Sequence, residues 1–202
     1  MLTTESYFDT IRRTWTDEIV VCSLGTTADS WWDATRSTSS FYVNAAMGFA
    51  SSVALGIALR LSQARVWALD SDGALAMNLG GILTEAAAAP PNFAHIVLDN
   101  RSYGCLHGAP LVNAGRTDYA AIARDAGIAA AVSVESADDL GAALAQSRTG
   151  HAFVVAHVAS PPRGVGLEPP LAIPLDGPEL KYAFGRHMES RFGIQVFGPQ
   201  GY

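Results

Sequence analysis

The chain has 202 residues, of which 49% are hydrophobic and 16% are charged, and its formal net charge at pH 7 is −6. This length allows one domain with a sizeable core. Its single lysine, Lys181, and the excess of acidic over basic residues argue against a broad nucleic-acid-binding surface.

The N-terminal segment and the cysteine content predict a cytoplasmic protein. Residues 1–10 are polar and acidic, and they lack the basic flank and apolar stretch of a signal peptide. The apolar region 45–61 is interrupted by glycine and serine, so no membrane span is expected. We interpret Cys22 and Cys105 as free thiols of a reducing compartment.

Apolar periodicity predicts alternating helices and strands along most of the chain. The predicted helices cover 4–16, the region of Trp31 and Trp32, 47–61, 74–89, 118–126 and 137–146. The predicted strands cover 19–24, 65–70, 93–98, 130–134 and 151–156. This alternation indicates an α/β fold with an open parallel sheet and helices on both faces.

Two polar turns follow the predicted strands 65–70 and 93–98, with Asp72 in the first and Asn100 in the second. A right-handed crossover makes the strands parallel neighbours, so both turns reach the carboxyl edge of the sheet, where such folds bind ligands. A carboxylate, an amide oxygen and a nearby backbone carbonyl suit Mg²⁺ or Ca²⁺. A helix that begins at 73–74 would favour an anion beside them, so the turns predict a metal-bridged diphosphate. The alternative is that Asp72 caps a helix and Asn100 shapes a turn.

The two turns resemble the metal and cofactor motif of thiamine diphosphate enzymes, in which Asp72-Gly73 is followed, about two dozen residues later, by Asp99-Asn100. Ser71 replaces the usual first glycine of that motif, and Asp99 replaces the usual first asparagine. The flanking segments narrow the resemblance to the small subunit, or half, of phosphonopyruvate and sulfopyruvate decarboxylases. These segments are 44–48, 77–80 and 98–104.

The resemblance runs from about Ile19 to Ser160 and implies the thiamine-diphosphate-binding fold, with a diphosphate-binding, PP-type domain over residues 1–160. It implies thiamine diphosphate and Mg²⁺ as cofactors. The implied metal ligands are Asp72, Asn100 and the backbone carbonyl of Ser102. The implied cofactor-binding residues are Gly25, Thr26, Thr27, Ala45, Met47, Gly73, Ala74, Tyr103, Cys105 and Leu106.

Two of the implied roles have alternatives in the sequence itself. Met47 would support a bent cofactor whose amino group meets the Ala45 carbonyl, but a methionine here also suits a core position. Gly25-Thr26-Thr27 would contact the diphosphate, or form an ordinary turn into a helix capped by Asp29 or Ser30.

The loop 103–108 holds the two candidate catalytic residues, Tyr103 and His107. A glycine-bounded loop above a rigid sheet often carries function. His107 could contact an anionic substrate or transfer a proton, and an exposed loop histidine is the alternative. We expect His95, inside a predicted strand, to be a core residue, and Glu85 to lie away from the site.

The resemblance implies the diphosphate-binding subunit of a two-subunit, thiamine-diphosphate-dependent decarboxylase that acts on a small 2-oxo acid. The catalytic glutamate of this superfamily belongs to a pyrimidine-binding domain, and no segment here resembles one. We therefore expect a separate pyrimidine-binding partner subunit to supply that glutamate. The alternatives are a carboligase subunit like acetolactate synthase or a split transketolase, and a non-catalytic cofactor-binding or regulatory subunit.

Residues 161–202 differ from the rest because they contain seven of the ten prolines. The pairs Pro161-Pro162 and Pro169-Pro170 preclude regular structure around them. One short helix is predicted over 180–188. The resemblance implies a tail that packs on a partner subunit. A disordered tail is the alternative, and the phenylalanines favour an apolar contact surface.

Overall fold

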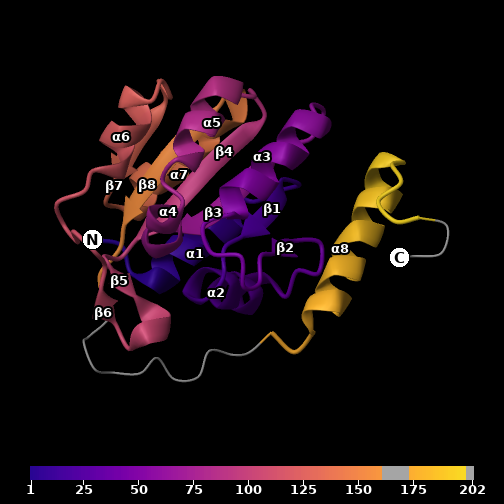
Figure 1. Cartoon of the computed structure of the whole chain (residues 1–202), viewed down its shortest axis with the longest axis horizontal. Coiled ribbons are helices and arrows are strands. Elements are labelled where there is room, and N and C mark those ends of the chain that lie inside the picture. The colour runs from indigo at the N-terminus through magenta and orange to yellow at the C-terminus, as the bar shows by residue number, and fades with distance from the viewer. Residues whose placement is uncertain (161–172, 199–202) are drawn as a thin grey trace.

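The computed structural model describes residues 1–160 and 173–198, and its centre is a sheet of parallel strands (Figure 1). The strand order is β2-β1-β3-β4-β8-β7, and every pair of neighbours is parallel. The strands are β1 (Ile19–Cys22), β2 (Phe41–Tyr42), β3 (Val66–Ser71), β4 (Phe93–Asp99), β7 (Ala131–Val134) and β8 (Ala152–His157). The predicted α/β fold is confirmed, and β2 is an edge strand that the sequence analysis missed.

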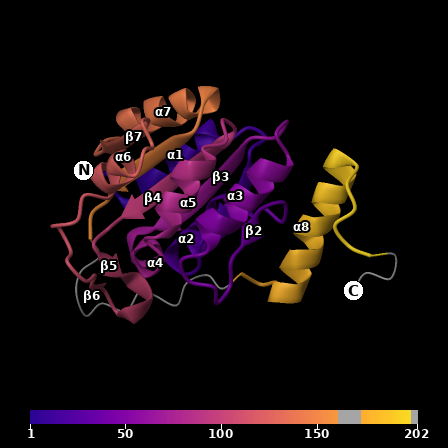
Figure 2. The same ribbon diagram turned by 45° about the horizontal axis from the view of Figure 1, so that its top comes forward.

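Helices cover both faces of this sheet. One face packs against α1 (Thr4–Thr14), α2 (Thr26–Thr35) and α7 (Ala137–Gln146). The other packs against α3 (Ala50–Arg60), α4 (Asp72–Met77), α5 (Gly81–Ala88) and α6 (Tyr119–Asp125). Figure 2 shows α3 and α5 side by side in front of the sheet.

Alternation along the buried strands divides the core between these two layers. In β3, Trp67 and Leu69 join the cluster under α1, α2 and α7, whereas Val66 and Ala68 join the cluster under α3. Successive side chains of a strand point to opposite faces, so a strand covered on both sides is apolar throughout. This explains why the sequence shows continuous apolar runs at the central strands.

Three predicted helix limits are wrong. The predicted helix 74–89 is two helices, α4 and α5, separated by 78–80, where the Asn78 side chain donates to the backbone oxygen of Gly48 at 2.8 Å. α2 begins at Thr26 after Gly25, so neither Asp29 nor Ser30 caps it. α3 begins at Ala50 rather than at 47, because the preceding loop contains positive φ angles at Ala45 and Gly48.

Gly48 is required by both its conformation and its surroundings. Its φ is +80°, and an added Cβ would lie 2.7 Å from Asn78 Cβ and 2.9 Å from the Ala74 oxygen. We expect Gly48→Ala to lower the free energy of unfolding by about 3 kcal/mol, through left-handed strain together with overpacking. Chemical denaturation measures this loss.

Gly193→Ala is the matched control, because Gly193 has a φ of +63° and no atoms within 4 Å of an added Cβ. Strain alone should cost about 1 kcal/mol there. Equal losses at the two positions would contradict the role of the Asn78 contact.

The C-terminal helix α8 (Gly177–Phe192) is longer than predicted and lies beside the β2 edge (Figure 1). Phe184 is buried there, with its ring 5.2 Å from that of Phe41. Arg191 forms an ion pair with Asp17 at 3.0 Å. α8 therefore contacts its own chain, and packing of the tail on a partner subunit stays a prediction. The proline pairs at 161–162 and 169–170 lie outside the described residues, and the boundary at 160/161 also stays a prediction.

The remaining elements are short. β5 (Ser102–Tyr103) and β6 (Ala109–Pro110) form an antiparallel pair, and 3₁₀ turns cover Gly104–Leu106 and Ser147–Thr149. Across the described residues, no helix combines the length and the apolar character that a membrane crossing requires.

Candidate active site

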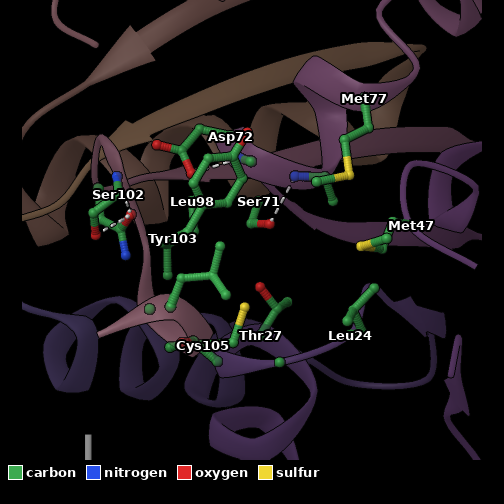
Figure 3. Close-up of a pocket in the computed structure, with 17 residues that line it drawn as sticks. Leu24, Thr27, Met47, Ser71, Asp72, Met77, Leu98, Ser102, Tyr103 and Cys105 are labelled. Atoms are coloured by element: carbon green, nitrogen blue, oxygen red, sulfur yellow. Dashed lines mark hydrogen bonds between the residues drawn. The ribbon is translucent and has the colours of Figure 1, made fainter. Parts of the chain in front are cut away.

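A pocket of about 340 Å³ lies at the carboxyl edge of the sheet (Figure 3). It is bounded by the start of α2, the β3–α4 turn, the end of β4 and the loop after β5. Twelve predicted site residues line it: Gly25, Thr26, Thr27, Met47, Asp72, Gly73, Ala74, Asn100, Ser102, Tyr103, Cys105 and Leu106. Ala45 and His107 are not among the lining residues. The fold thus brings together most of the residues that the sequence singled out, although their roles stay predictions.

Asp72 and Asn100 form the polar corner of the pocket. Asp72 is 1% exposed, and its two carboxylate oxygens accept from the backbone N–H groups of Gly73, at 2.7 Å, and Arg101, at 2.6 Å. Asn100 Oδ1 accepts from the backbone N–H of Ser102 at 3.0 Å. These bonds fix the carboxylate and the turn that follows β4.

The alternative stated above was that Asp72 caps a helix and Asn100 shapes a turn, and it holds only in part. Ser71, rather than Asp72, caps α4, because its hydroxyl accepts from the Ala74 N–H. Asn100 does shape its turn, through the bond to Ser102. Neither contact uses all the acceptor capacity of the carboxylate and amide oxygens. Both residues can therefore hold their turns and still present oxygens to a cation.

Asp72 lies in an environment that disfavours its charge. Burial, followed by the neighbouring Asp99 carboxyl, raises the pKa of Asp72 well above its usual range. In the described part of the chain, no lysine, arginine or histidine forms an ion pair with Asp72. A divalent cation at this corner would supply the missing positive charge.

The donor set suits a hard cation. Across residues 1–160 and 173–198, no group of three or more histidine, cysteine, aspartate or glutamate side chains could hold a metal. The oxygens that the fold places beside Asp72 belong to the Asn100 amide and to backbone carbonyls. Mixed oxygen ligands, completed by phosphate and water, are typical of Mg²⁺. The residues present fit that ion.

The opposite side of the pocket is formed by the start of α2. This helix has ten residues, and Gly25 precedes it without a side-chain cap, so its first N–H groups are available to a ligand. Thr27 is 1% exposed, and within the described residues its hydroxyl has no hydrogen-bond partner. A buried hydroxyl without a partner is costly, and the N-terminus of a helix favours an anion. This side fits a diphosphate.

Thr27→Val tests the anion site through its effects on the stability of the apo chain and on the affinity for thiamine diphosphate. The apo chain should keep its stability or gain up to about 1 kcal/mol, because a buried hydroxyl without a partner is removed. Affinity for thiamine diphosphate should fall about 10- to 100-fold, since a hydrogen bond to a charged group contributes about 1.5–3 kcal/mol. Thermal unfolding and calorimetric titration measure the two effects. Unchanged affinity would exclude the hydroxyl as a ligand.

The apolar end of the pocket is formed by Met47 and Met77, and Figure 3 places it opposite Asp72 and Ser102. Met47 is 49% exposed, so it is not a core filler. Met77 lines the same pocket and was not predicted as a site residue, because a methionine inside an apolar helix carries no distinct signal. Tyr103 packs so closely on Gly73 that a Cβ there would lie 2.8 Å from its ring.

Two predictions about residues outside the pocket are consistent with the structure. Glu85 is buried away from the pocket lining, and it accepts from His95, which lies in the core.

His157, which carried no motif, contacts Asp99 with its Nδ1 at 2.9 Å from Asp99 Oδ2. No local pattern signals this contact, because it depends on the register of β8 against β4.

Two comparisons with known proteins, one with family profiles and one with curated sequences, agree on one family. The profile described as "Thiamine pyrophosphate enzyme, C-terminal TPP binding domain" matches residues 21–158. Sulfopyruvate decarboxylase subunit beta of Methanothermobacter thermautotrophicus is 37% identical over 164 residues, which are 81% of this chain and 83% of the relative. Phosphonopyruvate decarboxylase of Streptomyces viridochromogenes is 32% identical over 161 residues, or 79% of this chain and 40% of the relative.

Solved structures show the same fold. Benzoylformate decarboxylase from Polynucleobacter necessarius matches with a TM-score of 0.63 and 19% identity, over 76% of this chain and 32% of that one. The family profile and the two decarboxylase relatives confirm the resemblance predicted from the sequence. The chain belongs to the family of thiamine pyrophosphate enzymes, as a C-terminal TPP-binding domain.

Proposed function

We propose that the chain is the diphosphate-binding subunit of a two-subunit, thiamine-diphosphate-dependent 2-oxo acid decarboxylase. The observation that carries the proposal is the pocket, which has a buried carboxylate and amide on one side and an uncapped helix start on the other. Support for decarboxylation comes from the relatives named sulfopyruvate and phosphonopyruvate decarboxylases. A small 2-oxo acid with an anionic end is the proposed substrate.

Asp72, Asn100 and the carbonyl of Ser102 would hold Mg²⁺, and the backbone around Gly25 and Gly73 would hold the diphosphate. Thiamine diphosphate supplies a ring that accepts the electrons released when carbon dioxide leaves. The protein orients this cofactor, and Met47 would support it from the apolar end of the pocket. The residues 103–106 would shield the site from water, which strengthens electrostatic interactions inside it.

The proposal includes a partner subunit that binds the pyrimidine ring and supplies a catalytic glutamate. No glutamate lines the pocket in the described part of the chain. Glu85 lies outside the pocket lining and is hydrogen-bonded to His95. Several relatives are named as subunit beta, which supports a second subunit. The roles of Tyr103 and His107 toward substrate remain predictions, as does a cytoplasmic location.

Calorimetric titration of thiamine diphosphate tests the proposal. It is carried out with Mg²⁺ and with EDTA, on the full chain alone and with the candidate partner subunit. Binding that requires Mg²⁺ and tightens with the partner is expected. Absence of binding in every mixture would reject the cofactor site and favour a non-catalytic subunit.

A product assay of the complex then tests the reaction. Incubation with sulfopyruvate, phosphonopyruvate or pyruvate should release carbon dioxide and the matching aldehyde. A product with a new carbon–carbon bond would instead assign the complex to the carboligases. Full activity of the chain without a partner would contradict the two-subunit architecture.

A further inference from the structure

The end of β8 supports the turn that carries Asn100. Asp99 and His157 are register partners in the β4–β8 ladder. The backbone N–H of Val158 donates to the oxygen of Asp99 at 2.9 Å, and the Ser160 hydroxyl donates to the oxygen of Asn100 at 2.6 Å. Residues 157–160, here called the β8 extension, therefore bind both residues of the Asp99-Asn100 turn.

The side chain of Asp99 has two close neighbours, the carboxyl of Asp72 and the ring of His157. Its carboxyl interacts with that of Asp72, and this like charge adds to burial in raising the pKa of Asp72. On its other side, Asp99 Oδ2 lies 2.9 Å from Nδ1 of His157. Asp99 is buried, whereas the His157 side chain is 25% exposed.

The His157 contact engages one oxygen of the Asp99 carboxylate, Oδ2, while the same carboxyl also interacts with Asp72. An N–H donated from Nδ1 would keep Oδ2 on the β8 side. Without that donor, Oδ2 would be free to compete with Asp72 for a cation or for its backbone donors. Groups that hydrogen-bond to metal ligands orient them, and their removal typically costs about 10- to 100-fold in metal affinity. Ser160 contacts the proposed ligand Asn100 directly, and His157 acts through Asp99, the residue before it.

We propose that His157 is a positioning residue for the cation site: by holding Asp99, it keeps Asp72 and Asn100 oriented toward the ion. Ser160 contributes in the same way through the Asn100 backbone. This inference rests on the proposed function, because it concerns the same Asp72–Asn100 corner. It goes beyond that function by assigning roles to two residues outside the pocket lining.

The test measures the Mg²⁺ concentration that gives half-maximal thiamine diphosphate binding to the full chain. For His157→Ala, we expect an increase of about 10- to 100-fold. His157→Asn, whose amide N–H can take the place of Nδ1–H, should recover most of the loss. Ser160→Ala, a small change that should not prevent folding, is expected to show a several-fold increase. His187→Ala, a histidine on α8 away from the pocket, is the matched control.

A double-mutant cycle with Asp99→Asn separates positioning from general destabilisation. If His157 acts through the Asp99 carboxylate, His157→Ala should have little further effect in the Asp99→Asn background. A merely structural role would lower the thermal midpoint of the apo chain by the same amount in both backgrounds and leave the Mg²⁺ dependence unchanged.

The outcomes distinguish this inference from the proposed function. Wild-type chain that binds the cofactor with Mg²⁺, together with His157→Ala and Ser160→Ala chains of unchanged Mg²⁺ dependence, would overturn the inference alone. If wild type binds no thiamine diphosphate, the proposed function fails, and Mn²⁺ binding followed by electron paramagnetic resonance still tests His157. Wild-type chain that binds neither would overturn both.

Discussion

Asp72→Ala is expected to abolish Mg²⁺-dependent binding of thiamine diphosphate. Asp72 is the carboxylate at the polar corner of the pocket, where it is 1% exposed and held by two backbone N–H groups. A cation there would lose its main negative ligand, and with it the bridge to the diphosphate. We expect the affinity for thiamine diphosphate at saturating Mg²⁺ to fall by at least about 100-fold. This loss is larger than the loss expected when a residue that only hydrogen-bonds to a metal ligand is removed.

The control for this variant is Asp125→Ala, an exposed aspartate at the end of α6, which should bind as wild type does. Circular dichroism of both variants checks that the apo chains are folded. Calorimetric titration with Mg²⁺ and with EDTA gives the affinities. Retention of Mg²⁺-dependent binding by the Asp72→Ala chain would show that the cation site lies elsewhere.

Glu85→Gln is expected to have the largest effect on stability. Glu85 belongs to a buried charge cluster, which we define as Asp70, Glu85, His95 and His151. Glu85 Oε2 lies 2.8 Å from His95 Nδ1, and Glu85 Oε1 lies 3.0 Å from His151 Nε2. His95 Nε2 lies 3.4 Å from Asp70 Oδ2, which is long for a hydrogen bond but close enough for ion pairing.

Removal of the Glu85 charge leaves the buried His95 with one carboxylate, that of Asp70 at 3.4 Å, and takes the closer partner away. Replacement of a single member of a buried ion pair typically costs about 3–5 kcal/mol. We therefore expect Glu85→Gln to lower the free energy of unfolding by about that amount, measured by chemical denaturation near pH 6. Glu135→Gln, an exposed glutamate, is the matched control and should change stability little. A loss below about 0.5 kcal/mol at Glu85 would mean that the cluster contributes little net stability.

The stability difference between wild type and Glu85→Gln should depend on pH. Burial alone would lower the pKa of His95, but the Glu85 and Asp70 carboxylates outweigh it and raise that pKa from 6.5 to about 10. Burial would raise the pKa of Glu85, but His95 and His151 outweigh it and lower that pKa below 4.5.

The way in which stability changes with pH follows from the raised pKa of His95 and the lowered pKa of Glu85. A raised histidine pKa adds stability that is complete below pH 6.5 and is lost as the pH rises through 10. A lowered glutamate pKa adds stability that is present above pH 4.5 and is lost at lower pH. The difference between the two proteins should therefore be largest between pH 4.5 and 6.5, and shrink toward pH 10. A difference that grows with rising pH would contradict the charged state of His95.

The sequence by itself determined the central part of the fold and the place of the site. Continuous apolar runs identify β3 and β4 because both of their faces are buried. The helix predicted over 137–146 is confirmed residue by residue, since its periodicity is a local signal, and Ser136 caps it. The sequence also predicted that Asp72 and Asn100 lie at the same edge of the sheet, because parallel strands connected by a crossover end on the same side.

Only the tertiary structure decided the contacts between distant segments. The break between α4 and α5 depends on Asn78 meeting Gly48, and the support of Asp99 depends on His157, 58 residues later. The two-residue strands β2, β5 and β6 are too short to show a period. Such features follow from strand register and from how helices are seated on the sheet, and a local pattern of apolar and polar residues specifies neither.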